Sequence, residues 1–436
     1  MKLSKITLAC LLATSGLGIA HVANAAASED FEFHGSFRAG VLTSSDDEYQ
    51  RNNWVGTKEM LGRLGIESDN DFGVNLSKRW NLDNDQSVKI TVDVVEEEDD
   101  YSASNFPGAF IEYKGITDTG TIWGGKRDYK KSDNYIFMTD FFYVDYSGTG
   151  VGIDGYQVGD AKISVAYMAS DRSDDDDYNL NDTYGTNNLM HAFIFGVDWG
   201  SFKLDMAAKY MNDNRSYTSG SEGYWNDTDS VWVDAVDGYY TNYTERGADI
   251  SATYSMPDFF GLPGNGFSKI IAQAGIGLGS QQLLGGTLTT YNGYRPGSVM
   301  KGGASGVATM ANNYDKDTSA RLLLWGGYFL DNGINLFPSI QAQYNNHEEE
   351  GTYDYWMSAM IRPTFPVADN FYIQTEVGYA YKNWDGSSWI EQKLTIAPTI
   401  VMGTGSGPAP EVRFLASYLP QSDDNIVFGV QADVWW

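Results

Sequence analysis

Short segments in which apolar and polar residues alternate recur along most of the chain. Residues 88–94 read VKITVDV, with Val or Ile at every second position and Lys, Thr and Asp between them. The same period of two returns at 202–210, 248–254 and 371–382. Successive side chains of a β-strand point to opposite faces, so this period indicates strands. Each segment is therefore predicted to be a strand with one apolar face and one polar face.

The connections between the predicted strands are polar and come in two lengths. Long ones, rich in Asp, Tyr, Ser or Gly, cover 171–187, 212–244 and 284–318. Short ones, such as 81–85 and 330–333, hold the Asn, Asp and Gly typical of tight turns. Outer-membrane barrels combine long external loops with short periplasmic turns. We interpret the acidic run inside 171–187 as a solvated part of such a loop.

The first 25 residues have the layout of a secretory signal. Lys2 and Lys5 precede an apolar run, and Ala23 and Ala25 form a small-residue cleavage site. We therefore predict a signal peptide at 1–25 and a single β-barrel domain at 26–436. Cys10 is the one cysteine of the chain and lies in the signal, so the mature protein is expected to contain no disulfide.

Charge and composition narrow the class of protein. The net charge of −29 disfavours nucleic acid or anionic lipid as a partner. No uncharged apolar run of membrane-helix length follows the signal. An exported, acidic, aromatic-rich chain with period-two patterning that ends in Trp436 is typical of a transmembrane β-barrel, with lipid outside and water inside. The barrel must be closed, because lipid offers an open edge no partners. A secreted soluble β-protein is the alternative.

A charged and aromatic stretch at 120–150 has the pattern strand, loop, strand. Such a mixture suits a water-filled lumen better than a packed core. Here, at IWGGKR and DFFYVDYSG, and at the distant blocks FHGSFRAG and FGVQADVWW, the chain resembles the maltoporin family of outer-membrane sugar channels. Length alone allows roughly 16 to 18 antiparallel strands, and the resemblance implies 18. It also implies a homotrimer in the outer membrane of a Gram-negative bacterium, and an inward-folded constriction loop at 131–140.

Three aromatic rings are predicted to face the lumen. Strand parity places Trp435, Trp356 and Phe267 on the polar faces of their strands. A pyranose has an apolar CH face that packs on an aromatic ring. The resemblance puts these three on an aromatic slide for sugar, and puts Tyr101 where a neighbouring subunit contributes a ring. The alternative is that they are girdle or loop-anchoring aromatics. Ser36 replaces a Tyr of the family, so the slide is expected to be shortened.

Charged residues are predicted to serve the hydroxyl groups of the sugar, since charged partners make the stronger hydrogen bonds. Parity directs Arg38 and Arg63 into the lumen, with Arg63 and Glu67 on one face of a strand. The resemblance adds a set of polar-track and constriction positions, namely Lys131, Asp133, Asp140, Asp145 and, at the narrowest point, Phe142. Lys131 replaces an Arg and loses its bidentate fork, and Phe142 replaces a Tyr and loses a hydroxyl. The alternative is the hydrated lumen of any porin.

The combined prediction is a passive, carbohydrate-selective porin for maltose- or maltodextrin-like oligosaccharides. The alternative is a general diffusion porin, weakly cation-selective, without a sugar site. An enzyme is disfavoured, because His34, His191 and His347 lie in no nucleophile or metal-ligand motif. No catalytic residue, metal or cofactor is predicted. The last two strands are joined only by 419–425, so a rather open mouth is expected.

Overall fold

The structure is a computed structural model that describes sixteen stretches of the chain. They are residues 31–44, 58–67, 70–82, 84–97, 105–171, 189–211, 215–218, 224–226, 231–233, 239–242, 244–287, 316–348, 351–384, 386–402, 410–421 and 426–436. The predicted signal peptide and Tyr101 lie outside the described residues. Among the described residues, no helix is long and apolar enough to cross a membrane.

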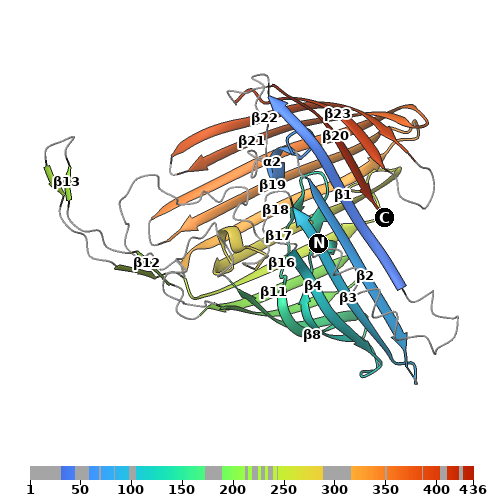
Figure 1. Cartoon of the computed structure of the whole chain (residues 1–436), viewed down its shortest axis with the longest axis vertical. Helices are drawn as coiled ribbons and strands as arrows, with labels where there is room; N and C mark the ends of the chain where they lie inside the picture. Colours follow the sequence, from blue (N-terminus) through green and yellow to red (C-terminus); the bar gives the residue numbers. More distant parts are fainter. Residues whose placement is uncertain are drawn as a thin grey trace, which may run out of the picture.

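Eighteen strands form one closed antiparallel barrel (Figure 1). They are β1 (Phe31–Ser44), β2 (Asp71–Asn81), β3 (Ser87–Glu97), β4 (Asn105–Lys114), β5 (Thr121–Arg127), β8 (Gly148–Val158), β9 (Ala161–Asp171), β10 (Leu189–Asp198), β11 (Phe202–Met211), β16 (Arg246–Met256), β17 (Asn265–Gly277), β18 (Thr318–Phe329), β19 (Asn335–His347), β20 (Thr352–Ala368), β21 (Phe371–Trp384), β22 (Ser387–Val401), β23 (Glu411–Tyr418) and β24 (Ile426–Trp435). Pairing of β1 with β24 closes the barrel. The predicted 18-stranded all-β barrel is confirmed.

Short strands also occur in one of the predicted long connections, 212–244. β12 (Arg215–Thr218) pairs with β15 (Tyr239–Asn242), and β13 (Tyr224–Asn226) pairs with β14 (Val231–Val233). All four lie between β11 and β16. The short turns also fall where the sequence placed them, since β2 ends at Asn81 and β18 ends at Phe329.

The outward faces carry the apolar residues that parity assigned to lipid. Phe33 and Val41 of β1 and Phe428 of β24 are all exposed on the single chain. Phe33 packs against Trp436, with ring centroids 5.7 Å apart. The inward faces of the same strands carry Arg38 and Asp433, which form an ion pair. The strand faces deduced from the period of two are therefore correct at this seam of the barrel.

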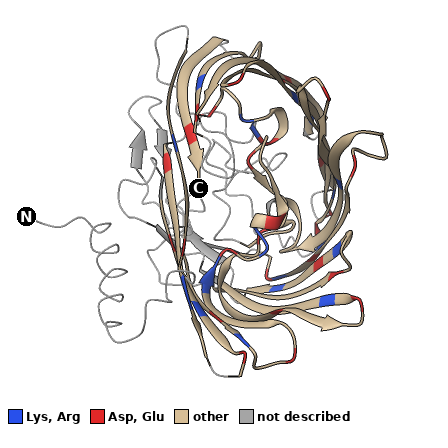
Figure 2. Ribbon diagram, turned by 90° about the vertical axis from the view of Figure 1, so that its right-hand side faces the viewer, with Lys and Arg blue, Asp and Glu red and all other residues tan. Residues whose placement is uncertain are grey.

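Among the described residues, three stretches fold into the lumen, and Figure 2 shows chain inside the wall of strands. The first inner segment (58–67) begins with the short helix α2 (Lys58–Leu61). The second inner segment (128–147) contains a 3-10 turn, η1 (Ser132–Asn134), and the small hairpin of β6 (Tyr135–Ile136) and β7 (Phe141–Phe142). The third inner segment (278–287) contains the 3-10 turn η4 (Gln281–Leu283). The predicted inward fold of 131–140 is confirmed.

Backbone hydrogen bonds join the three inner segments. The Arg63 amide donates to the Met138 carbonyl at 2.9 Å, which links the first segment to the second. The Asp145 amide donates to Gly285 at 2.7 Å, and the Thr287 amide donates back to Asp145 at 3.0 Å. The second inner segment is therefore held from both sides, and the three form one layer inside the barrel.

The second inner segment is held on the wall by apolar packing. Ile136, Met138 and Phe141 are buried in one hydrophobic cluster with Leu323 and Trp325 of β18. Burial of this much apolar surface inside the lumen drives the segment against the strands rather than into the channel water. The side of the hairpin that carries Tyr135 and Phe142 is left half-buried.

The first inner segment is held on β22 and β23 by side chains that bind its carbonyl groups. Lys393 donates to the carbonyls of Gly62 and Leu64, and Ser417 donates to Gly65 at 2.8 Å. The prediction of a strand through Arg63 and Glu67 is wrong. Gly62 and Gly65 have φ values of 91° and 72°, a left-handed conformation that breaks a strand and that glycine adopts without strain.

Candidate functional site

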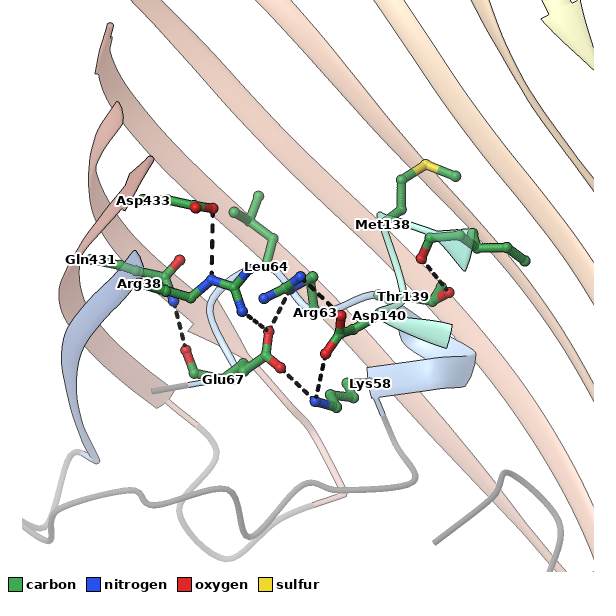
Figure 3. Close-up of polar contacts among 12 residues, drawn as sticks. Arg38, Lys58, Arg63, Leu64, Glu67, Met138, Thr139, Asp140, Gln431 and Asp433 are labelled. Carbon is green, nitrogen blue, oxygen red and sulfur yellow. Dashed lines mark hydrogen bonds and ion pairs between the residues drawn. The ribbon is translucent and has the colours of Figure 1, made fainter. Parts of the chain in front are cut away.

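Six charged side chains meet where the first and second inner segments approach β1 and β24 (Figure 3). We call this set the constriction network; its members are Arg38, Lys58, Arg63, Glu67, Asp140 and Asp433. Lys58 Nζ and Arg63 Nε each donate to the Glu67 carboxylate at 2.5 Å. Arg38 lies 3.6 Å from both Glu67 and Asp433. The network therefore connects the barrel wall to the first inner segment.

Asp140 extends the network to the second inner segment. Its Oδ2 accepts from Lys58 at 3.2 Å, and its Oδ1 accepts from Arg63 Nη1 at 3.2 Å and from the Tyr135 hydroxyl at 2.6 Å. The side chains of Lys58, Arg63 and Asp140 are 10 to 23% exposed. They therefore keep some contact with water while bonded to each other. Arg38, Arg63 and Asp140 were predicted to line the lumen together, and the structure brings them together.

An aromatic pair adjoins the network on the β6–β7 hairpin. The rings of Tyr135 and Phe142 stack with centroids 4.5 Å apart and planes at 24°. Lys131 Nζ lies 4.8 Å from the Phe142 centroid. Because Ile136 and Phe141 form the buried side of the same hairpin, Tyr135 and Phe142 form the side turned away from that core. An aromatic surface thus lies beside hydrogen-bonding charges.

The other two predicted polar-track residues of the second inner segment differ in exposure. The Asp133 side chain is 68% exposed and pairs with Lys203 at 3.2 Å. Asp145 is buried, and its Oδ1 accepts from the hydroxyl of Ser147 at 2.5 Å. Burial raises the pKa of Asp145 to about 6. The expectation that Asp145 is available to a solute is therefore wrong, because Asp145 is buried where the second inner segment pairs with the third.

Glu59 is a buried acid next to the network. Its backbone carbonyl accepts from Gln341 at 2.9 Å, whereas its Oε2 has no hydrogen-bond partner among the described residues. Burial raises the pKa of Glu59 to about 7, partly offset by the charge of Lys58. A carboxyl group in such surroundings favours its neutral form. Glu59 was not singled out from the sequence.

The predicted slide residues divide into an exposed ring and a buried one. Trp435 is 56% exposed, pairs with Ser36 across the seam and shares the face of Asp433. Trp356 also points inward but is 1% exposed, because Met60 and Leu61 of α2 pack over it. The prediction that Trp356 offers its ring to channel water is therefore wrong, since the first inner segment covers it.

Phe267 lies within a group of inward-facing rings. It packs edge-on against Trp325 at 5.2 Å and near Phe329 at 6.3 Å. Phe337 and Phe137 complete the group, with their centroids 5.2 Å apart. These rings lie toward the short-turn end of β17, β18 and β19, and all except Trp325 are partly exposed. Phe267 was predicted to face inward and does so.

Sequence reasoning missed Lys58, Tyr135 and Phe137 as parts of this site. Tyr135 and Phe137 stand in the charged and aromatic stretch, so the composition of that loop was the available signal. Lys58 gave none, because it follows a long polar connection. Within the described part of the chain, no three His, Cys, Asp or Glu side chains are placed to hold a metal ion.

Proteins of similar sequence cover most of this chain. The chain is 26% identical over 429 residues to a maltoporin of Hahella chejuensis, which covers 93% of this chain and 92% of that protein. It is 26% identical over 436 residues to maltoporin 2 of Yersinia pestis, at 94% and 95% coverage. Among solved structures, OccK5 (OpdH) of Pseudomonas aeruginosa matches at a TM-score of 0.46 and 10% identity, covering 94% of this chain and 98% of that one. The family described as LamB porin matches residues 31–436, and the chain therefore belongs to the LamB porin family.

Proposed function

We propose that the constriction network and the Tyr135–Phe142 pair form the sugar-selective point of this channel for maltodextrin-like oligosaccharides. The family makes the protein a passive carbohydrate porin of the Gram-negative outer membrane and not an enzyme. The observation that carries the finer proposal is the stacked pair beside Asp140 and Arg63. One surface suits the CH face of a pyranose and the other suits its hydroxyl groups.

The proposed path has an aromatic element on each side of this point. Trp435, exposed next to Ser36, is proposed to guide sugar on one side. Phe267 and the rings around it are proposed to do so on the other. Trp356 is left out because it is covered, and Tyr101 stays a prediction from the sequence. Lys131 and Asp133, which are both partly exposed, are proposed to add hydroxyl contacts.

A conducting channel must bind its solute weakly enough to release it again. In the constriction network each cation has two carboxylate partners, so one contact can be exchanged for a sugar hydroxyl while another is kept. Lys58, for example, donates to both Glu67 and Asp140. Such exchange keeps the affinity for the oligosaccharide moderate and lets the oligosaccharide pass through the constriction.

The proposal on assembly rests on the family, and the proposal on processing rests on the sequence of the first 25 residues. We propose a homotrimer in outer-membrane lipid and cleavage of the signal after Ala25. Native mass measurement of the detergent-solubilised protein tests the first proposal. Amino-terminal sequencing of the mature protein tests the second, with Ala26 as the expected first residue.

Single-channel current across a planar bilayer tests the proposed substrate. Maltose and longer maltodextrins are added in steps, and polyethylene glycol of matched size serves as the control solute. Sugar is expected to reduce the current until the effect saturates, while the polymer is not. Phe142→Ala is expected to raise the current without sugar, because it removes a bulky ring at the constriction. A general diffusion porin would show no saturable reduction with any sugar.

A further inference from the structure

Tyr135 occupies the junction between the aromatic pair and the constriction network. Its ring stacks on Phe142, and its hydroxyl lies 2.6 Å from Asp140 Oδ1 and 3.1 Å from Arg63 Nη1. It is the aromatic residue of the described chain whose hydroxyl contacts both of these charged groups. Phe142 itself carries no hydroxyl, so the phenol group at this point comes from Tyr135.

The direction of the hydrogen bonds follows from the number of protons available. A guanidinium has no acceptor, so Arg63 must donate to the Tyr135 oxygen. The single phenol proton is then free to bond to Asp140. Burial and the neighbouring Asp140 charge raise the pKa of Tyr135 well above its ordinary value. The hydroxyl therefore keeps its proton, and the order Arg63, Tyr135, Asp140 is fixed.

The backbone holds this arrangement in place. Tyr135 is paired with Phe142 across the β6–β7 hairpin, and the Tyr143 amide donates to Asn134 at 3.0 Å. The hairpin is in turn packed on the wall through Ile136 and Phe141. Movement of the Tyr135 ring would thus disturb both the stacking surface and the position of the Asp140 carboxylate.

We propose that Tyr135 is a positioning residue that sets sugar affinity at the constriction. Its hydroxyl orients Asp140 and Arg63 toward the sugar, and its ring supports Phe142. This inference rests on the proposed function. It predicts that hydroxyl and ring have separable effects, the first on sugar affinity and the second also on pore width.

The test is sugar block of single-channel current in Tyr135→Phe, with Tyr129→Phe as the matched control. Tyr129 belongs to the same inner segment, is buried and donates its hydroxyl to Asp154 at 2.7 Å, away from the constriction network. Tyr135→Phe is expected to raise the half-blocking maltodextrin concentration about tenfold, the usual size of one lost hydrogen bond to a charged group. Current without sugar is expected to change less than in Tyr135→Leu, because Tyr135→Phe keeps the ring that stacks on Phe142. Tyr129→Phe is expected to match the wild type in both measurements.

A second set of variants separates positioning of Asp140 by the Tyr135 hydroxyl from a nonspecific widening of the constriction. Tyr135→Leu is expected to weaken block and also to raise the open current, because Phe142 loses its support. If Tyr135 acts through Asp140, adding Tyr135→Phe to Asp140→Asn causes little further loss. Three outcomes would each overturn the inference. The half-blocking sugar concentration of Tyr135→Phe could equal that of the wild type, or Tyr129→Phe could show the same loss of block as Tyr135→Phe. The losses caused by Tyr135→Phe and Asp140→Asn could also add up in the double variant. Absence of saturable block in the wild type would instead overturn the proposed function and the inference with it.

Discussion

The lumen contains two groups of charged side chains that differ in their exposure to water. Beneath the first inner segment, Glu376 accepts from Lys393, from Arg362 Nε at 2.5 Å and from the Leu64 amide at 3.0 Å. Side-chain exposure in this group is 0 to 8%. In the constriction network the Glu67 carboxylate is buried as deeply, at 1% exposure, whereas Lys58, Arg63 and Asp140 are 15%, 10% and 23% exposed. The first group is thus closed off from water, while the cations and Asp140 of the second stay in contact with it.

The comparison shows which charges are structural and which are available to a solute. A buried charge must be satisfied by the protein alone, and Glu376 fixes both its cations and the loop above it. A partly solvated pair contributes little to stability, so its partners can be replaced by a sugar hydroxyl at small cost. Inward direction alone, which is what strand parity predicts, does not separate the two groups.

The largest effect is expected from Glu376→Ala. Removing this carboxylate leaves the charges of Lys393 and Arg362 buried without their anionic partner, which typically costs about 3–5 kcal/mol. The free energy of unfolding, measured by denaturant titration of the refolded barrel, is expected to fall by that amount. Glu391→Ala is the control, since Glu391 pairs with Lys382 at 2.7 Å in a partly exposed pair. Equal losses of unfolding free energy in both variants would contradict the distinction between buried and partly exposed charges.

Trp356→Ala is expected to act on stability and not on sugar. The ring lies under Met60 and Leu61, so truncation leaves a cavity, at a typical cost of about 3–5 kcal/mol. Trp356→Phe keeps most of the apolar volume and is expected to recover most of that loss. Measured half-blocking sugar concentration should be unchanged in Trp356→Phe. A weaker sugar block in this variant would return Trp356 to the sugar path.

Trp435→Ala is expected to show the opposite pattern. The ring is exposed, so its removal leaves little cavity, but it takes away a stacking surface worth about 1 kcal/mol. Sugar block is expected to weaken several-fold while the unfolding midpoint hardly moves. Unaltered block would indicate that Trp435 is a girdle residue.

The smallest effect concerns pH and Glu59. Its pKa of about 7 lies above the ordinary value near 4.5, so the folded state holds this proton more tightly than the unfolded chain does. Its contribution to stability is complete below about pH 4.5 and is lost as pH rises through about 7. Glu59→Gln mimics the neutral acid and is expected to lose less stability than the wild type between pH 5 and 8. Identical pH profiles for the two proteins would contradict the burial of Glu59.

The sequence predicted the barrel well, because a period of two directly reports the two faces of a strand. Parity correctly placed Arg38, Phe267 and the inward side of Trp356. It wrongly predicted a strand through Arg63, although Arg63 does reach the lumen, because two glycines and the side chains of distant strands shape a turn that no local pattern reveals. It also failed for the cover over Trp356, since packing between remote segments is not encoded in the alternation of one strand.

The role of Tyr135 shows the same limit. Its charged and aromatic surroundings predicted a lumen loop, and the resemblance indicated the constriction. Which ring stacks on Phe142, and which hydroxyl lies between Arg63 and Asp140, depends on the register of the β6–β7 hairpin and on the approach of the first inner segment. Both are properties of the folded chain.

Cysteine labelling at two matched serines tests the division of the lumen most directly. Ser36 is exposed beside Trp435, and Ser417 is buried against Gly65, although both face inward. In a chain without Cys10, Ser36→Cys is expected to react quickly with a water-soluble thiol reagent, and maltodextrin is expected to slow that reaction until the effect saturates. Ser417→Cys is expected to react slowly with or without sugar. Equal labelling rates at the two positions, or no protection of Ser36→Cys by sugar, would contradict the account.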